Sequence, residues 1–135
     1  MAGIFGSNTL FSEVDGIVTK NGKPCVGAKI EQKVYTASSE EIAATTSTDD
    51  MGRFAFEEIS QNKGLLGFLP SEFVATQRLV ISYEGKEYLG WAYTKRSPTK
   101  NSESDGKSFS LVCDLSKPPV EDDKYNGICR LQKNE

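Results

Sequence analysis

Residues 48–56 read TDDMGRFAF, and this stretch decides the class of fold. Asp49 and Gly52 favour a turn, because aspartate hydrogen-bonds its own backbone and glycine accepts a positive φ. Phe54 and Phe56 are two residues apart, which places both on the same side of an extended chain. The pattern predicts a β-hairpin that closes on a pair of core phenylalanines.

The chain before this stretch predicts two more strands. The first covers residues 13–19 and is followed by Asn21-Gly22, a dipeptide suited to the positive φ angles of a tight turn. The second runs from Ala28 to about Tyr35 and alternates apolar with charged residues, as a strand with one buried face does. The residues expected on its buried face are Ala28, Ile30 and Val34.

Strand patterns continue to the end of the chain. A threonine-rich strand is expected from Thr45, and others at residues 77–83, 86–94, 107–113 and 127–131, with a turn at Glu84-Gly85. Residues 37–44 fit either a helical turn or a surface loop. Residues 95–106 are polar throughout and predict a solvated, mobile loop.

About seven short strands separated by turns indicate an all-β protein, a two-sheet antiparallel β-sandwich. A chain of 135 residues suffices for one hydrophobic core. We therefore expect residues 13–135 to form a single domain and residues 1–12 to be an N-terminal extension.

Two stretches together resemble the carboxypeptidase regulatory-like domains. The first is Gly16–Ala28, with its Asn-Gly-Lys-Pro turn and Gly-Ala entry to the next strand, and the second is residues 48–56. The resemblance covers residues 14–59 and implies a transthyretin- or immunoglobulin-like sandwich. It also implies membership of a group of small bacterial single-domain proteins, which often act in the envelope, in secretion or in neutralising toxins.

Composition removes several classes of function. The chain has no histidine, which excludes serine triads, cysteine–histidine dyads and histidine-based zinc or copper sites. The same absence argues against the hydroxyisourate hydrolases, which resemble transthyretin in shape and depend on histidines. A net charge of −3 without a basic stripe disfavours a nucleic-acid partner, and no stretch approaches a membrane span. We expect no enzymatic activity, no cofactor and no metal.

The three cysteines leave alternatives open. Cys113 and Cys129 either form a disulfide or remain buried thiols, with zinc binding by all three cysteines as a third reading. Cys25 is expected to be a small buried side chain. Residues 1–12 carry no signal peptide, so the protein is expected in the cytoplasm if Met1 is its native start. A Cys113–Cys129 disulfide would instead indicate the periplasm or the cell exterior.

Two groups of apolar residues are candidates for partner binding. The first lies in an apolar loop that either caps the sandwich or contacts a partner, and its members are Leu65, Leu66, Phe68, Leu69 and Phe73. The second is Trp91 and Tyr93, which share one strand face and form either core or an aromatic binding surface.

These observations lead to three hypotheses of function. The first is a non-enzymatic bacterial module that binds another protein, such as an immunity or inhibitor protein or a secretion-linked adaptor. The second is a structural spacer or capping domain of the cell envelope. The third is a carbohydrate-binding module, which requires Trp91 and Tyr93 to be exposed together on a flat face.

Overall fold

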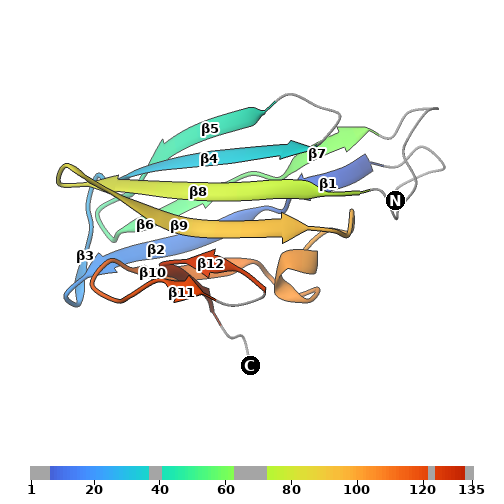
Figure 1. Cartoon of the computed structure of the whole chain (residues 1–135). Helices are drawn as coiled ribbons and strands as arrows, with labels where there is room; N and C mark the ends of the chain where they lie inside the picture. The colour runs from blue at the N-terminus through green and yellow to red at the C-terminus, as the bar shows by residue number, and fades with distance from the viewer. Residues whose placement is uncertain (1–6, 37–40, 63–72, 122–123, 133–135) are drawn as a thin grey trace.

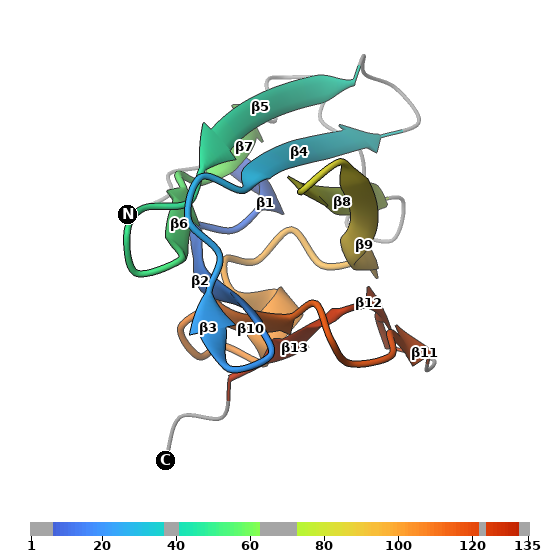
Figure 2. The same cartoon turned by 90° about the vertical axis from the view of Figure 1, so that its left-hand side faces the viewer.

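The computed structural model describes residues 7–36, 41–62, 73–121 and 124–132. Most of these residues lie in strands, and two main sheets pack face to face (Figure 1). Figure 2 shows the layers from one end, with β4, β5, β8 and β9 in one and β2, β3 and β10 in the other. The predicted all-β sandwich is confirmed.

The larger sheet is antiparallel throughout. Its strands, in spatial order, are β11 (Val120–Glu121), β12 (Asn126–Gly127), β9 (Lys86–Lys95), β8 (Ala75–Tyr83), β4 (Lys29–Thr36) and β5 (Ile42–Ser47). The predicted inner face of β4 is confirmed, because Ala28, Ile30 and Val34 are all fully buried. The opposite face of this sheet, which alternates with the buried residues, points to solvent.

The smaller sheet contains one parallel pairing, which the sequence pattern did not predict. Its strands are β13 (Cys129–Leu131), β10 (Ser110–Asp114), β2 (Val14–Lys20), β3 (Lys23–Pro24) and β6 (Arg53–Phe56), the last two both pairing with β2. Residues 15–19 of β2 pair in parallel with residues 110–114 of β10. A parallel pair needs a long crossover, and here the chain builds the larger sheet between the two strands.

Part of the expected N-terminal extension, residues 1–12, is a strand of the fold. β1 (Ser7–Phe11) pairs with β7 (Ile59–Asn62) in a small separate sheet. Its register shifts between Thr9 and Phe11, and both Leu10 and Phe11 are fully buried. A bulge of this kind lets neighbouring residues both face inward.

The turn at residues 49–52 forms as predicted, but the hairpin prediction is wrong. The backbone N–H groups of Met51 and Arg53 each donate to Asp49 Oδ1 at 2.9 Å, and Phe54 and Phe56 are buried. β5 pairs with β4, however, whereas β6 pairs with β2. The turn is a corner between sheets because Gly52, at φ 77°, lies against β2 and accepts a hydrogen bond from Val18 N at 2.8 Å.

A bulge in β9 brings two large aromatic residues to the same face of the sheet. Trp91 pairs with Leu79 and Leu89 pairs with Val80, so Gly90 is the extra residue between them. Tyr88 and Trp91 therefore both face the core, three residues apart. Gly127, at φ 123°, crosses so closely that a Cβ there would lie 2.3 Å from the Gly90 carbonyl oxygen.

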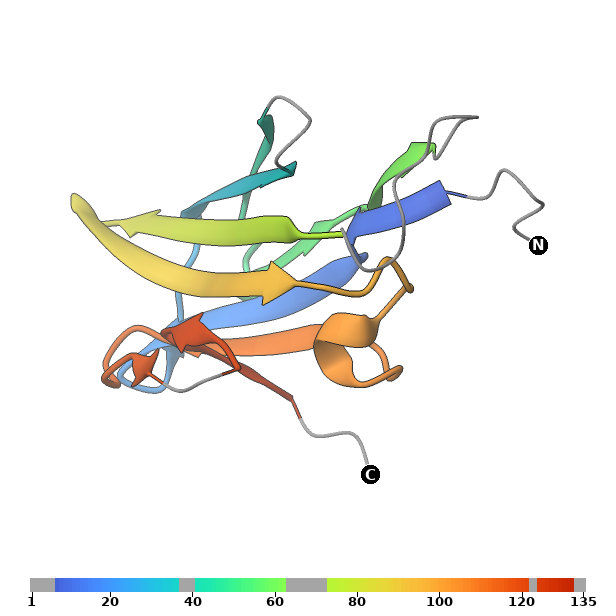
Figure 3. The same ribbon diagram turned by 45° about the vertical axis from the view of Figure 1, so that its right-hand side comes forward.

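The prediction of a solvated loop at residues 95–106 is wrong in its central feature. The segment contains a short 3₁₀ helix, η2 (Ser102–Ser104), and the Lys95 and Glu103 side chains are fully buried. Figure 3 shows η2 at the same end of the sandwich as β1. The two charges are buried because they pair with each other. The polar residues around them in the sequence do not reveal this pairing.

Candidate binding groove and the buried ion pair beside it

The predicted apolar loop lies mostly outside the described residues. Leu65, Leu66, Phe68 and Leu69 fall within residues 63–72, which the structure does not describe. Phe73 is described and is 1% exposed, packed into the core cluster.

Trp91 and Tyr93 share a face, as predicted, and that face is the core side. Trp91 is fully buried, and its ring lies 5.5 Å from that of Tyr93, centroid to centroid. Phe109 and Tyr125 pack on the same indole at 5.1 and 4.7 Å. The exposed aromatic face that a carbohydrate-binding module would need is therefore absent at Trp91.

Of the alternatives left open for the three cysteines, the structure has the disulfide. Cys113 and Cys129 lie opposite each other on β10 and β13 and form a disulfide. Cys25 is a free thiol, 1% exposed, and burial raises its pKa. A raised pKa keeps the thiol protonated and therefore poorly nucleophilic.

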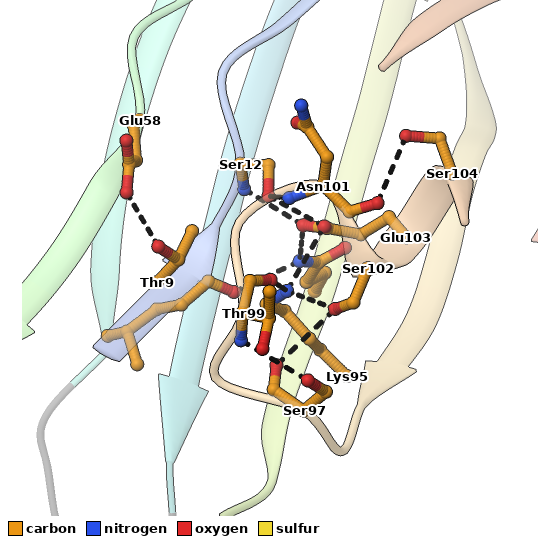
Figure 4. Close-up of polar contacts among 12 residues, drawn as sticks. Thr9, Ser12, Glu58, Lys95, Ser97, Thr99, Asn101, Ser102, Glu103 and Ser104 are labelled. Carbon is orange, nitrogen blue, oxygen red and sulfur yellow. Dashed lines mark hydrogen bonds and ion pairs between the residues drawn. The ribbon is translucent and has the colours of Figure 1, made fainter. Parts of the chain in front are cut away.

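A buried ion pair occupies the end of the sandwich beside η2 (Figure 4). Lys95 is the last residue of β9 and Glu103 lies in η2, with Nζ and Oε1 3.2 Å apart. Both side chains are 0% exposed. Charged groups are buried this completely only when they are paired and hydrogen-bonded.

The Glu103 carboxylate accepts hydrogen bonds from two other parts of the chain. Ser12 donates twice, through its backbone N at 2.8 Å and its Oγ at 2.6 Å, and Gln77 Nε2 donates at 2.7 Å. Burial by itself would raise the pKa of Glu103. The bonds from Ser12 and Gln77 and the charge of Lys95 outweigh burial, so the pKa lies below its ordinary value and the carboxylate stays charged.

The Lys95 ammonium group holds the loop that follows β9. It donates to the Thr99 carbonyl oxygen at 2.6 Å and to Ser102 Oγ. Burial lowers the pKa of Lys95, and the charge of Glu103 opposes that effect. With three acceptors, the ammonium group has all its hydrogen bonds satisfied, so the cluster acts as a clamp on the loop.

Gln77 connects this clamp to the core. Its Nε2 also donates to the Leu10 carbonyl oxygen at 3.0 Å, and its Oε1 accepts from Trp91 Nε1 at 2.9 Å. Gln77 is not singled out from the sequence, although it could have been. Gln77 lies on the same strand face as Leu79 and Ile81, where an apolar residue is expected. A polar side chain at such a position implies buried partners.

The outer face of the larger sheet carries a groove of about 770 Å³. One row across its floor follows the strand pairing from Lys33 to Arg78, Ala92 and Asn126. The small side chain of Ala92 leaves space beside the long side chain of Arg78. The groove is lined on its outer face by Tyr35, Arg78 and Arg96, and Tyr93 and Tyr125 border it although their rings pack against Trp91 on the core side.

The clamped loop forms one end of this groove. A neighbouring hollow of about 450 Å³ shares Tyr93, Thr94, Arg96 and Lys124 with the groove and adds Ser97 and Ser102. Ser102 Oγ also accepts a hydrogen bond from the Lys95 ammonium group. The buried ion pair thus positions the loop that borders the groove.

Arg78 is the central unpaired charge of the groove. Among the described residues its side chain makes no hydrogen bond or ion pair, whereas neighbouring Lys33 lies 3.9 Å from Glu31. Arg78 is exposed on β8, and Tyr35 on β4 is 46% exposed. An unpaired guanidinium beside exposed tyrosine is suited to bind acceptor groups of another molecule.

Within the described ranges, no three acidic or cysteine side chains gather as they would around a metal ion. The same residues include no helix with the length and apolar character required to cross a membrane.

Comparison with known proteins identifies the family. No curated protein matches the sequence. A family model does match residues 14–118, a stretch that includes Gln77, Arg78, Lys95 and Glu103 but neither Ser12 nor Cys129. The chain therefore belongs to the family described as "Domain of unknown function (DUF6795)".

Proposed function

We propose that this protein is a non-enzymatic module that binds another protein through the groove on the outer face of its larger sheet. The observation that carries the proposal is Arg78, an unpaired charge in a hollow that Tyr35 and Arg96 also line. Tyrosine and arginine are enriched at protein–protein interfaces and among the residues that contribute most to binding.

The rigidity of the groove supports the same function. Its floor is formed by β4, β8 and β9, which pair continuously apart from the bulge at Gly90. Its end is held by the Lys95–Glu103 pair. A preformed surface loses little conformational entropy when a partner binds, which favours affinity.

The finer proposal is a bacterial immunity or inhibitor protein, or a secretion-linked adaptor. Its support is the similarity of residues 14–59 to carboxypeptidase regulatory-like domains, whose small bacterial relatives often have such roles. Each of these roles depends on binding a protein partner, and the groove is the surface that we assign to it.

A paired charge-reversal experiment tests the proposal. Wild-type protein, Arg78→Glu and Lys23→Glu are immobilised and exposed to an extract of the cells that express the protein. Both variants change the charge by the same amount, but Lys23 is on β3 of the other sheet. We expect wild type and Lys23→Glu to capture a partner. Calorimetry with that partner should show an affinity for Arg78→Glu at least about tenfold lower than for wild type. Equal binding by all three proteins would refute the assignment of the groove.

A spacer or capping role in the cell envelope is the second candidate. The Cys113–Cys129 disulfide favours it, because such bonds persist in oxidising compartments. Thiol titration of protein isolated under acid quenching measures this directly. We expect one reactive thiol after unfolding, from Cys25, whereas three would place the protein in a reducing compartment.

A further inference from the structure

β5 is a regular strand at the exposed edge of the larger sheet. It pairs with β4 at six consecutive positions, from Lys29–Ser47 to Val34–Ile42, without a bulge. Within the described part of the chain, no strand pairs with its other side. The backbone groups on that side are free to pair with a further strand.

The other terminal strands of the two main sheets are protected against such pairing. β11 is two residues long and follows Pro118 and Pro119, β3 is two residues long and includes Pro24, and β13 is three residues long and contains Arg130. β6 has four residues and begins with Arg53. Short length, proline and charge are the usual devices that prevent edge-to-edge association. β5, with the sequence IAATTS, uses none of them.

We propose that two copies of this protein associate through β5, with the strand antiparallel to its counterpart across a two-fold axis, so that the larger sheets join into one. This contact uses the edge of the sheet, whereas the groove lies on its face and reaches that edge at Glu41.

The absence of charge favours a second copy as the occupant. A two-fold axis brings a strand against itself, so a charged residue near the axis would lie close to the same charge of the other copy. The adjoining β4 carries Lys29, Glu31 and Lys33, but β5 carries no charged residue. The uncharged β5 therefore introduces no like-charge repulsion when it pairs with its own copy.

Side-chain exposure on β5 is consistent with this contact. Ile42 is 37% exposed although it pairs with buried Val34, and Ala44 and Thr46 are only half-buried although they pair with buried residues of β4. The opposing sheet therefore covers the core side of β5 incompletely. A second copy of the strand beside it would cover these apolar atoms.

Symmetry and charge also determine the register. Adjacent residues point their backbone groups to opposite sides, so a two-fold pairing must place one residue opposite itself. Centring on Ala44 puts Glu41 opposite Ser47, whereas centring on Thr45 puts Glu41 opposite Asp49, with like charges facing. These are the two registers that pair five of the six β5 residues with one another, so we place Ala44 on the axis.

Sedimentation velocity of the full chain, from about 1 μM to about 500 μM, tests the association. We expect wild type to shift with concentration from its 14.8 kDa monomer to twice that mass. Thr45→Lys, which places two lysines on either side of the axis, should remain monomeric across the range. Ser108→Lys adds the same charge in an exposed loop and should dimerise like wild type. Circular dichroism checks folding, and Ala43→Lys repeats the test at a second exposed position of β5.

Cysteine cross-linking tests the register. Ala44→Cys should form an intermolecular disulfide on mild oxidation, because directly opposite residues have Cα atoms about 4.5–5.5 Å apart. Thr46→Cys, opposite Ile42 of the second copy, should remain uncross-linked. A monomeric wild type at every concentration, or a dimer that persists in both lysine variants, would overturn the proposal. Efficient cross-linking through Thr46→Cys would overturn the register.

Discussion

The two ends of the sandwich are held by different chemistry. At the end near β3, Thr48 Oγ1 accepts a hydrogen bond from Ala28 N at 2.8 Å and donates to the Cys25 carbonyl oxygen at 2.5 Å. At the end near η2, the buried Lys95–Glu103 pair holds the loop (Figure 4). The first end uses neutral groups next to recognisable turns, and the second uses two full charges.

The two ends should therefore lose different amounts of stability when a hydrogen-bonding or charged partner is removed. A neutral buried hydrogen bond contributes about 1 kcal/mol to stability, and its loss leaves a modest desolvation penalty. A buried charge that loses its partner retains a far larger penalty. The η2 end is therefore expected to be more sensitive to substitution, although the intact ion pair need not make it more stable than an apolar core would.

The largest effect is expected from breaking the ion pair. Glu103→Ala leaves the Lys95 ammonium group buried without its counter-charge and should lower the free energy of unfolding by about 3–5 kcal/mol. Urea denaturation measures the change. Glu87→Ala, on the exposed part of β9, is the matched control and should change stability by less than about 0.5 kcal/mol.

A double substitution separates the worth of the ion pair from the cost of breaking it. Lys95→Met combined with Glu103→Leu removes both charges, and we expect it to recover part of the stability lost in Glu103→Ala, because Ser12 and Gln77 still lose their shared acceptor. If Glu103→Ala costs no more than Glu87→Ala, the proposed contrast between the two ends does not hold.

A smaller loss is expected at the opposite end. Thr48→Val keeps the shape of the side chain but removes the hydroxyl that serves Ala28 and Cys25. Unfolding free energy should fall by about 1–3 kcal/mol, because two buried backbone groups lose their partner. Thr94→Val, at an exposed position of β9, should have almost no effect in the same assay. A loss as large as that of Glu103→Ala would make the two clamps equivalent.

Lowering the pH should weaken the η2 end by protonating the Glu103 carboxylate. Because the pKa of Glu103 in the folded chain lies below the ordinary value of 4.5, its contribution to stability is present above pH 4.5 and is lost as pH falls through the folded value. The Lys95→Met, Glu103→Leu double variant should therefore lose less stability than wild type below pH 4.5. Thr48→Val should keep the wild-type pH dependence. If unfolding free energy falls equally with pH in wild type, the double variant and Thr48→Val, Glu103 does not have this role.

The smallest effect on stability is expected in the groove. Arg78 has no side-chain partner among the described residues, so Arg78→Ala should change the free energy of unfolding by less than about 0.5 kcal/mol. Thermal unfolding of the variant beside wild type measures this. A clear destabilisation would mean that Arg78 supports the sheet, and would remove the main argument for a binding role.

Much of the fold could be predicted because its signals are local. The turns predicted at Asn21-Gly22 and Glu84-Gly85 both form, and Asn21 and Gly22 have the positive φ angles that their sequence predicts. Period-two alternation also predicts the buried face of β4. Each of these features depends on residues that are neighbours in the chain.

The candidate site was much harder to predict. Tyr93, a predicted candidate, borders the groove but packs its ring against buried Trp91, and the sequence does not indicate Arg78 or Arg96 as part of the groove. Lys95 and Glu103 were interpreted as solvated because their neighbours are polar. Their burial depends on Ser12 and Gln77, which are 91 and 26 residues from Glu103 in the sequence.

By itself the sequence determined the class of fold, the tight turns and the buried face of β4, because turn chemistry and strand alternation act over a few residues. Tertiary structure alone decided that the turn at residues 49–52 joins two sheets, that β2 and β10 run parallel, and that a lysine and a glutamate leave solvent together. These outcomes depend on which distant segments meet. Only that meeting supplies the second charge that makes burial of the first one tolerable.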